Sequence, residues 1–142
     1  MIQMNSLYVM TDQKKQIFQI YFAGASLAFG FPLLVGEVIS LVFGGFSNEF
    51  SQLFSILYIL LHVLGGLVGG TLVARKVDKQ ETVRAGAVTG LLAFLLHQVV
   101  YSFFYGTGVI GDPFTLFALI GGSIAGAMYT KQKMPHNIQV DK

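Results

Sequence analysis

Four long apolar stretches, separated by short polar segments, dominate the hydrophobic pattern of this chain. They cover about residues 17–45, 53–74, 83–105 and 113–130. Each is long enough to cross a bilayer as a helix, which takes roughly 20 apolar residues at about 1.5 Å of rise each. The stretches are continuously apolar rather than alternating, so membrane strands are not indicated. Because backbone groups in lipid must find partners within their own segment, the pattern predicts an all-α, integral membrane four-helix bundle.

The composition narrows the class of protein further. Hydrophobic residues make up 54% of the 142 residues and charged residues 11%, whereas about a quarter of a typical soluble chain is charged. This balance argues against a soluble enzyme and against a nucleic-acid partner, and it makes the lipid bilayer the expected surrounding. The absence of cysteine excludes disulfides, thiolate metal sites and thiol catalysis. We expect one transmembrane domain over residues 1–133, followed by a polar cytoplasmic tail over 134–142.

The basic residues predict how the bundle is oriented. All nine fall before the first stretch, between the second and third, or after the fourth: Lys14, Lys15, Arg75, Lys76, Lys79, Arg84, Lys131, Lys133 and Lys142. The other two connections contain Glu49 and Asp112 but no Lys or Arg. The positive-inside rule therefore predicts a multi-pass protein of the cell membrane with both termini in the cytoplasm.

Glycine pairs recur at matching places in the second and fourth stretches. The segments that start at Leu64 and Ile120 align without a gap, and the third stretch begins with a further pair four residues apart. Glycines at this spacing share one helix face and let two backbones approach closely. The predicted helix-packing positions are Gly65, Gly66, Gly69, Gly70, Gly86, Gly90, Gly121, Gly122 and Gly126.

The glycine pattern has two interpretations. The glycines either pack the helices of one chain together, or one glycine face contacts another subunit, in a homo-oligomer or a larger membrane complex. The matched segments also suggest two tandem helical hairpins, formed by the first and second stretches and by the third and fourth.

Three ionisable side chains fall inside the apolar stretches: Glu37, His62 and His97. Such residues are functional candidates by default. His62 lies 13 residues before Arg75 and His97 lies 13 residues after Arg84, so an antiparallel pair of helices would hold both imidazoles about 20 Å from the same interface. Glu37 lies 22 residues after Lys15, about 33 Å along the helix, near the outer edge of the bilayer.

These residues leave three chemical alternatives open. The first is a site for a proton or ion built from His62, His97 and Glu37, with Tyr58, Gln98 and Tyr101 supplying hydrogen bonds. The second is polar packing between helices, with Glu37 as an interfacial carboxylate. The third is axial ligation of a haem b by the two histidines. Small residues continue both histidine faces and favour helices too close for a macrocycle, so no cofactor and no metal is the expectation.

The glycine segments over Gly65–Gly70 and Gly86–Gly90, with the basic turn over Arg75–Arg84, resemble small uncharacterised four-helix membrane proteins of bacteria and archaea. This resemblance implies no defined activity. The sequence contains no nucleophile–base–acid set or paired catalytic carboxylates, so we expect no enzymatic activity. The leading hypothesis is an accessory or oligomer-forming subunit packed through its glycine faces. The alternatives are a small ion or solute transporter or channel using the three ionisable residues, and an electron carrier with haem b.

Overall fold

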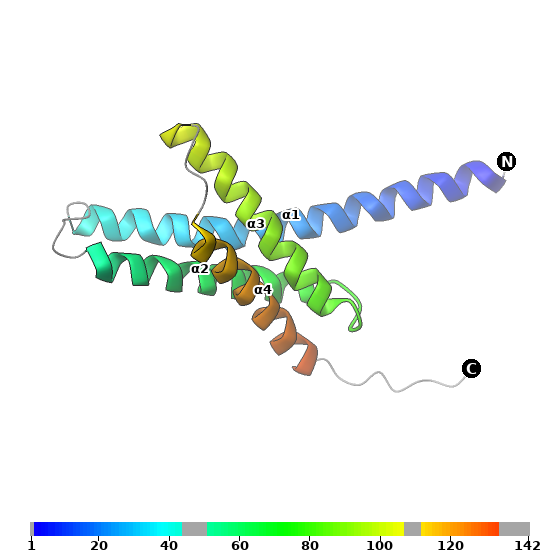
Figure 1. Cartoon of the computed structure of the whole chain (residues 1–142). Coiled ribbons are helices and arrows are strands. Elements are labelled where there is room, and N and C mark those ends of the chain that lie inside the picture. Colours follow the sequence, from blue (N-terminus) through cyan, green and yellow to red (C-terminus); the bar gives the residue numbers. More distant parts are fainter. Residues whose placement is uncertain (1, 44–50, 107–111, 134–142) are drawn as a thin grey trace.

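The computed structural model describes residues 2–43, 51–106 and 112–133 (Figure 1). This part of the chain forms four helices and no strand: α1 (Ile2–Val42), α2 (Ser51–Ala74), α3 (Thr82–Tyr105) and α4 (Pro113–Lys133). The predicted all-α fold with four helices is confirmed. The predicted tail over 134–142 and most of the two connections without basic residues lie outside the described residues.

All four helices are long and apolar enough to cross a membrane. The spans that qualify are Lys15–Val42, Leu53–Ala74, Thr82–Phe104 and Pro113–Lys133. Large apolar side chains face outward along them, with Leu41 80% exposed and Phe103 83% exposed. In water an apolar surface of this extent would drive association. Lipid is the surrounding in which such a surface is stable.

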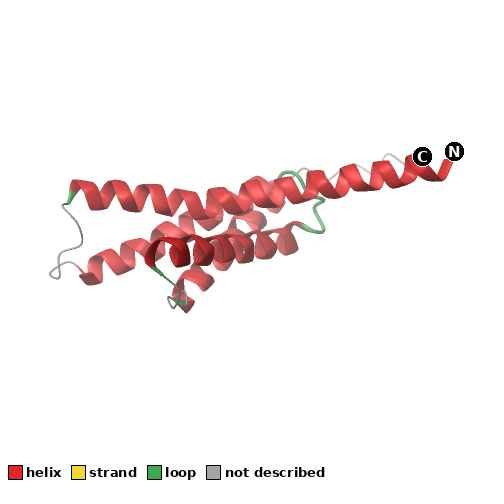
Figure 2. Cartoon of the chain, turned by 90° about the horizontal axis from the view of Figure 1, so that it is seen from above, coloured by secondary structure: helices red, strands yellow, loops and turns green. Residues whose placement is uncertain are grey.

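The first helix begins well before the predicted start near residue 17. It has 41 residues, a length of about 60 Å, and its N-terminal part projects beyond the other helices (Figures 1 and 2). The prediction used hydropathy, which drops before residue 17, but an α-helix satisfies its own backbone in water as well as in lipid. No glycine or proline occurs before Gly24 to end the helix. The membrane span and the helix are therefore different lengths.

The helices form two hairpins that cross each other. The α1–α2 hairpin lies along the long direction of the molecule, and the α3–α4 hairpin runs across it (Figure 1). The most extensive contact joins α2 to α4, while α1 scarcely touches α4. The central cluster of buried apolar residues is mostly small: Ala25, Ala28, Phe29, Ala93 and Leu119. Small side chains bring the helix axes together and leave the larger ones to face outward.

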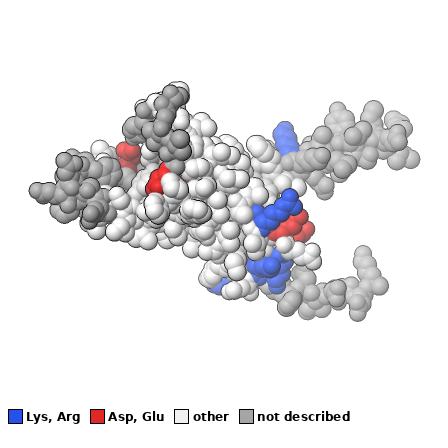
Figure 3. Space-filling model, viewed as in Figure 1, with Lys and Arg blue, Asp and Glu red and all other residues white. Residues whose placement is uncertain are grey.

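Charged side chains divide between the two ends of the bundle. Figure 3 shows Lys and Arg gathered at one end, whereas Asp and Glu occur at both. The basic end combines the C-terminal ends of α2 and α4 with the start of α3, where Arg75, Arg84 and Lys133 are exposed. The basic residues that the structure describes, which the sequence confines to certain segments, are thus also confined to one end of the bundle.

Candidate functional site

The contact between α2 and α4 is made by backbone against backbone. A methyl group placed on Gly66 would lie 2.6 Å from the carbonyl oxygen of Leu119, and one on Gly70 would meet the carbonyl of Ser123. In each case the glycine hydrogen takes the direction of that missing methyl and points at a carbonyl oxygen of the other helix. Such Cα–H···O contacts recur where helices approach closely in membranes.

This contact is reciprocal. On α4, a methyl group on Gly122 would meet the carbonyl of Val63, just as one on Gly66 would meet that of Leu119. Adding 56 to a residue number of α2 gives the equivalent position on α4: Gly66 corresponds to Gly122, and Val63 to Leu119. The two contacts are therefore equivalent. The same shift relates the contacts of Gly70 and Gly126, which faces the Leu67 carbonyl. Helices α2 and α4 therefore meet like the two halves of an isologous dimer, within one chain.

The other two glycines of α2 face α1. A methyl group on Gly69 would lie 2.8 Å from the Ala28 Cβ, and one on Gly65 would lie 2.7 Å from Pro32 Cδ and against the Ala28 carbonyl. Pro32 has no N–H, so it cannot donate to Ala28 four residues earlier, and the Gly65 hydrogen is aimed at that carbonyl instead. The doubled glycines of α2 thus serve two different neighbours, and both faces are occupied inside the chain.

The remaining predicted packing positions divide. Gly86 and Gly90 of α3 face α4, where a methyl group on Gly90 would lie 2.6 Å from the Ile120 Cα. Gly121 takes no part in this packing: it is exposed, and nothing in the described chain lies within 4 Å of its missing methyl group. Its counterpart Gly65 accommodates α1, but α3 packs on a different face of α4. Sequence alignment alone could not indicate that the hairpins differ in this way.

The two histidines lie together between α2 and α3. His62 is 1% exposed and His97 is 5% exposed, and their ring centroids are 5.4 Å apart. The equal spacing of 13 residues from the basic turn predicted a similar depth for the two side chains and left open whether they face each other; the structure brings their rings into contact.

Two tyrosines complete a polar cluster, which we define as Tyr58, His62, His97 and Tyr101. The Tyr58 hydroxyl lies 2.9 Å from His97 Nε2 and 2.7 Å from the Tyr101 hydroxyl. His62 Nδ1 donates to the backbone carbonyl of Tyr58 at 2.8 Å. Each tyrosine is four residues from a histidine on its own helix, so the pairs share a face. The tyrosines were expected as hydrogen-bond partners, and Tyr58 is the one that joins the two helices.

Aromatic rings surround His97 on several sides. Tyr101 stacks on it with centroids 4.2 Å apart, Phe94 lies nearly parallel at 6.4 Å, and Phe29 of α1 meets it edge to face at 5.8 Å. The contribution of Phe29 was missed by the sequence analysis. The signal for it was the run of small residues around Ala25 and Ala28, which marks the packed face of α1. One ring nitrogen of His97, Nδ1, is buried and has no hydrogen-bond partner in the described chain.

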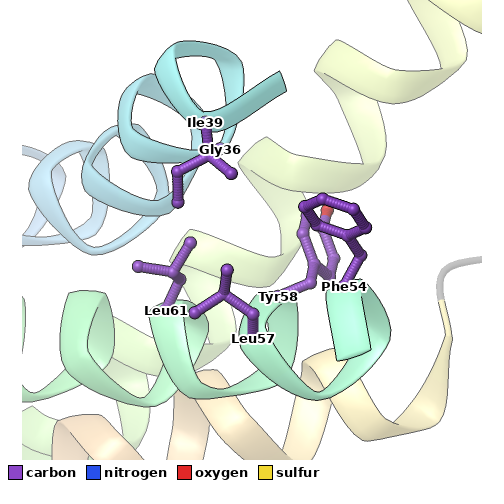
Figure 4. A pocket seen from close by; sticks show the side chains of 6 residues that line it. All are labelled: Gly36, Ile39, Phe54, Leu57, Tyr58 and Leu61. Carbon is purple, nitrogen blue, oxygen red and sulfur yellow. The ribbon is translucent and has the colours of Figure 1, made fainter. Parts of the chain in front are cut away.

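Glu37 does not join this cluster. It is exposed on the part of α1 that follows Pro32. The neighbouring Gly36 lines a small pocket with Tyr58, but the other lining residues are apolar, and neither histidine is among them (Figure 4). Within the described residues, no group of three or more His, Asp or Glu side chains could hold a metal ion. The three ionisable residues proposed as one site are therefore divided into a buried histidine pair and a separate surface carboxylate.

Comparisons of the chain with protein-family models, with curated proteins and with solved structures found no match. The resemblance to glycine-rich four-helix membrane proteins stays a prediction. Any assignment of function rests on the geometry of the polar cluster and of the glycine contacts.

Proposed function

We propose that this chain is a small multi-pass membrane transport protein, and that the polar cluster handles the transported ion or small solute. The observation that carries the proposal is the burial of two histidines side by side, linked through Tyr58, between two helices that are apolar enough to cross a membrane. Ionisable groups inside a membrane span are costly, and they commonly mark proton relays and substrate pathways.

A purely structural role explains the polar cluster less well. Close packing is already provided by the glycine contacts of α2 with α1 and α4. The unpartnered His97 Nδ1 costs about 1–3 kcal/mol of unmet hydrogen bonding, which a contact selected for stability would avoid. The shift of 56 positions pairs His62 with Ala118, so the histidine lies outside the scaffold that the two halves share.

The experiment is reconstitution of the purified chain into proteoliposomes, with proton, sodium, potassium and ammonium flux measured separately. The variant is His97→Gln, because glutamine can still form hydrogen bonds but cannot take up a proton. Its matched control is Val99→Ala, which alters an exposed position two residues away on the same helix. We expect flux of at least one of these ions in the wild type and the control, and a loss of that flux in His97→Gln. Flux equal to that of empty vesicles for every ion would reject the transport function.

We also propose that the basic end of the bundle is cytoplasmic, which places both termini on that side. The support is the gathering of Lys and Arg at one end (Figure 3) and the positive-inside rule. The chain has no cysteine, so a single introduced thiol can be labelled without background. In intact cells, an impermeant maleimide should label Phe43→Cys, at the opposite end, and spare Gln80→Cys in the turn between α2 and α3. The reverse pattern would overturn the orientation.

An oligomer-forming accessory role has one observation in its favour. Gly121 and Ala125 are exposed on α4, and their counterparts on α2, Gly65 and Gly69, accommodate a helix. Ala125→Cys in the otherwise cysteine-free chain should then form a disulfide-linked dimer in membranes, while Val99→Cys on α3 should not. If neither variant crosslinks, or both do so equally, the α4 face is simply in contact with lipid.

A further inference from the structure

We propose that the species carried through the polar cluster is the proton, and that it passes along Tyr101, Tyr58 and His97, with His97 Nδ1 at one end of the path. This inference rests on the transport function proposed above and names its substrate. Three observations lead to it: the burial of both histidines, the hydroxyl groups that can each donate or accept a hydrogen bond, and the unpartnered nitrogen.

Within the described residues, the polar cluster offers no set of ligands for a metal ion. Both histidines are almost fully buried, and the pocket beside Tyr58 is lined otherwise by apolar residues and glycine (Figure 4). Metal ions need several ligands in a defined geometry, and the described residues offer no group of three such side chains. A proton differs from every other ion because it moves from one hydrogen-bonding atom to the next and needs no cavity.

The two histidines differ in what their hydrogen bonds permit. His62 Nδ1 faces a backbone carbonyl, which can only accept, so this nitrogen carries a hydrogen and the tautomer of His62 is fixed. His97 Nε2 faces the Tyr58 hydroxyl, which can either donate or accept. The Tyr58 hydroxyl in turn faces the Tyr101 hydroxyl, which can likewise donate or accept a hydrogen bond. The hydrogen bonds from His97 through Tyr58 to Tyr101 can therefore point in either of two directions, whereas His62 beside them keeps one tautomer.

In the first direction, His97 Nε2–H donates to Tyr58, Tyr58 donates to Tyr101, and Nδ1 is bare. A proton that binds Nδ1 creates an imidazolium. The Nε2 proton then moves to the Tyr58 oxygen while the Tyr58 proton moves to the Tyr101 oxygen, and the original Tyr101 proton leaves to water. One proton enters and one leaves, with no oxidation or reduction. All hydrogen bonds of the path are now reversed, and the hydroxyls and the ring proton must reset before the next transfer.

The unpartnered His97 Nδ1 is what a proton path requires at its end. An imidazole ring whose two nitrogens both have hydrogen-bond partners could not take up a proton without breaking one of those bonds. Here Nε2 is engaged by Tyr58 and Nδ1 has no partner within the described chain. This nitrogen is the atom of the polar cluster that can bind an entering proton while Nε2 stays bonded to Tyr58.

The test uses proteoliposomes that enclose a pH-sensitive dye, with a potassium gradient and valinomycin to drive proton entry. Tyr58→Phe removes the hydroxyl that joins His97 to Tyr101 and keeps the ring that lines the pocket. Tyr129→Phe is the matched control, because Tyr129 is 53% exposed and lies on α4, outside the polar cluster. We expect proton flux in the wild type and the control, and a reduction of about tenfold or more in Tyr58→Phe.

The outcomes separate the inference from the function on which it rests. Proton flux that survives in Tyr58→Phe overturns the path, and so does His97-dependent flux of sodium, potassium or ammonium without proton flux, which leaves the transport function standing. No flux of any ion overturns both. If Tyr58→Phe fails to fold, Tyr101→Phe tests the same path and leaves the bond between Tyr58 and His97 intact. In the wild type, ¹⁵N NMR of labelled histidine should find two tautomers at His97 and one at His62; a single tautomer at His97 overturns the reversal.

Discussion

Helix α2 contacts α4 and α3 in two different ways. Against α4 it presents Gly66 and Gly70, whose hydrogens meet carbonyl oxygens, and both of these glycine contacts have a counterpart 56 positions away. Against α3 it presents the Tyr58 hydroxyl, which bonds to His97 and Tyr101, and the His62 ring, which meets the His97 ring edge to face. These contacts have no such counterpart. One helix thus makes two kinds of contact: its glycine face packs against the other half of the chain, and its polar face, nearer the N-terminal end, contributes Tyr58 and His62 to the polar cluster.

The second contact exists because the two hairpins are not equivalent. Helix α1 packs on Gly65 and Gly69 of α2, whereas α3 avoids the matching Gly121 face of α4 and packs beside Ser123 and Ala127. In that position α3 also reaches α1 and α2, while α1 scarcely touches α4. A symmetric arrangement would have kept His97 away from His62. The polar cluster and the open Gly121 face both follow from the position of α3, which does not match the position of α1 in the other hairpin.

The largest effect is expected from disturbing the symmetric contact. Gly66→Leu places a side chain where even a methyl group would lie 2.6 Å from the Leu119 carbonyl, and backbone cannot yield as a side chain can. We expect a loss of about 3 kcal/mol or more in the free energy of unfolding, or failure to assemble. Unfolding in detergent by added SDS measures it. Val99→Leu, at an exposed position, is the control and should change little. Equal stability of both variants would show that the α2–α4 contact is not the one that holds the halves together.

A smaller effect on stability, with a large effect on function, is expected at the asymmetric contact. His97→Leu removes the buried nitrogen that has no partner, and the bond between Tyr58 and Tyr101 stays in place. The gain from removing an unmet group offsets the lost bond to Tyr58, so we expect a change of about 1 kcal/mol or less in unfolding free energy. Transport should nevertheless be lost. If His97→Leu instead lowers the unfolding free energy strongly and transport is retained, the α2–α3 contact serves stability and not transport.

The bond between the tyrosines should appear as a coupling. Tyr58→Phe and Tyr101→Phe each remove one hydroxyl of a pair 2.7 Å apart, so the double variant should lose less than the sum of the two single losses. We expect a coupling of about 0.5–1.5 kcal/mol in unfolding free energy from a double-mutant cycle. Additive losses would mean that the two hydroxyls do not bond in the membrane, and the proposed proton path would lack its middle step.

The sequence predicted what local spacing determines and missed what depends on how the hairpins meet. Four spans follow from hydropathy, and equal distances to one turn predict a similar depth for His62 and His97, but not that their rings face each other. The start of α1 was misplaced because the edge of a membrane span was taken for the end of a helix. Glu37 was left open between the histidine site and the membrane interface, because its position along one helix does not say which other helix that face meets. Gly121 was assigned to packing because its segment matches that of Gly65, and only the tertiary arrangement shows that α3 lies elsewhere.

Two adjacent glycines of α4 offer the smallest and most discriminating test. Gly121 has open space where a methyl group would go, whereas a methyl group on Gly122 would meet the Val63 carbonyl. Alanine at an unobstructed helical position is favoured over glycine by about 0.5–1 kcal/mol, because glycine has more backbone freedom to lose. Gly121→Ala should therefore raise the unfolding free energy slightly, and Gly122→Ala should lower it. If Gly121→Ala instead weakens self-association in membranes, that face contacts a second copy, and the asymmetry of the hairpins has left an interface rather than a lipid-facing surface.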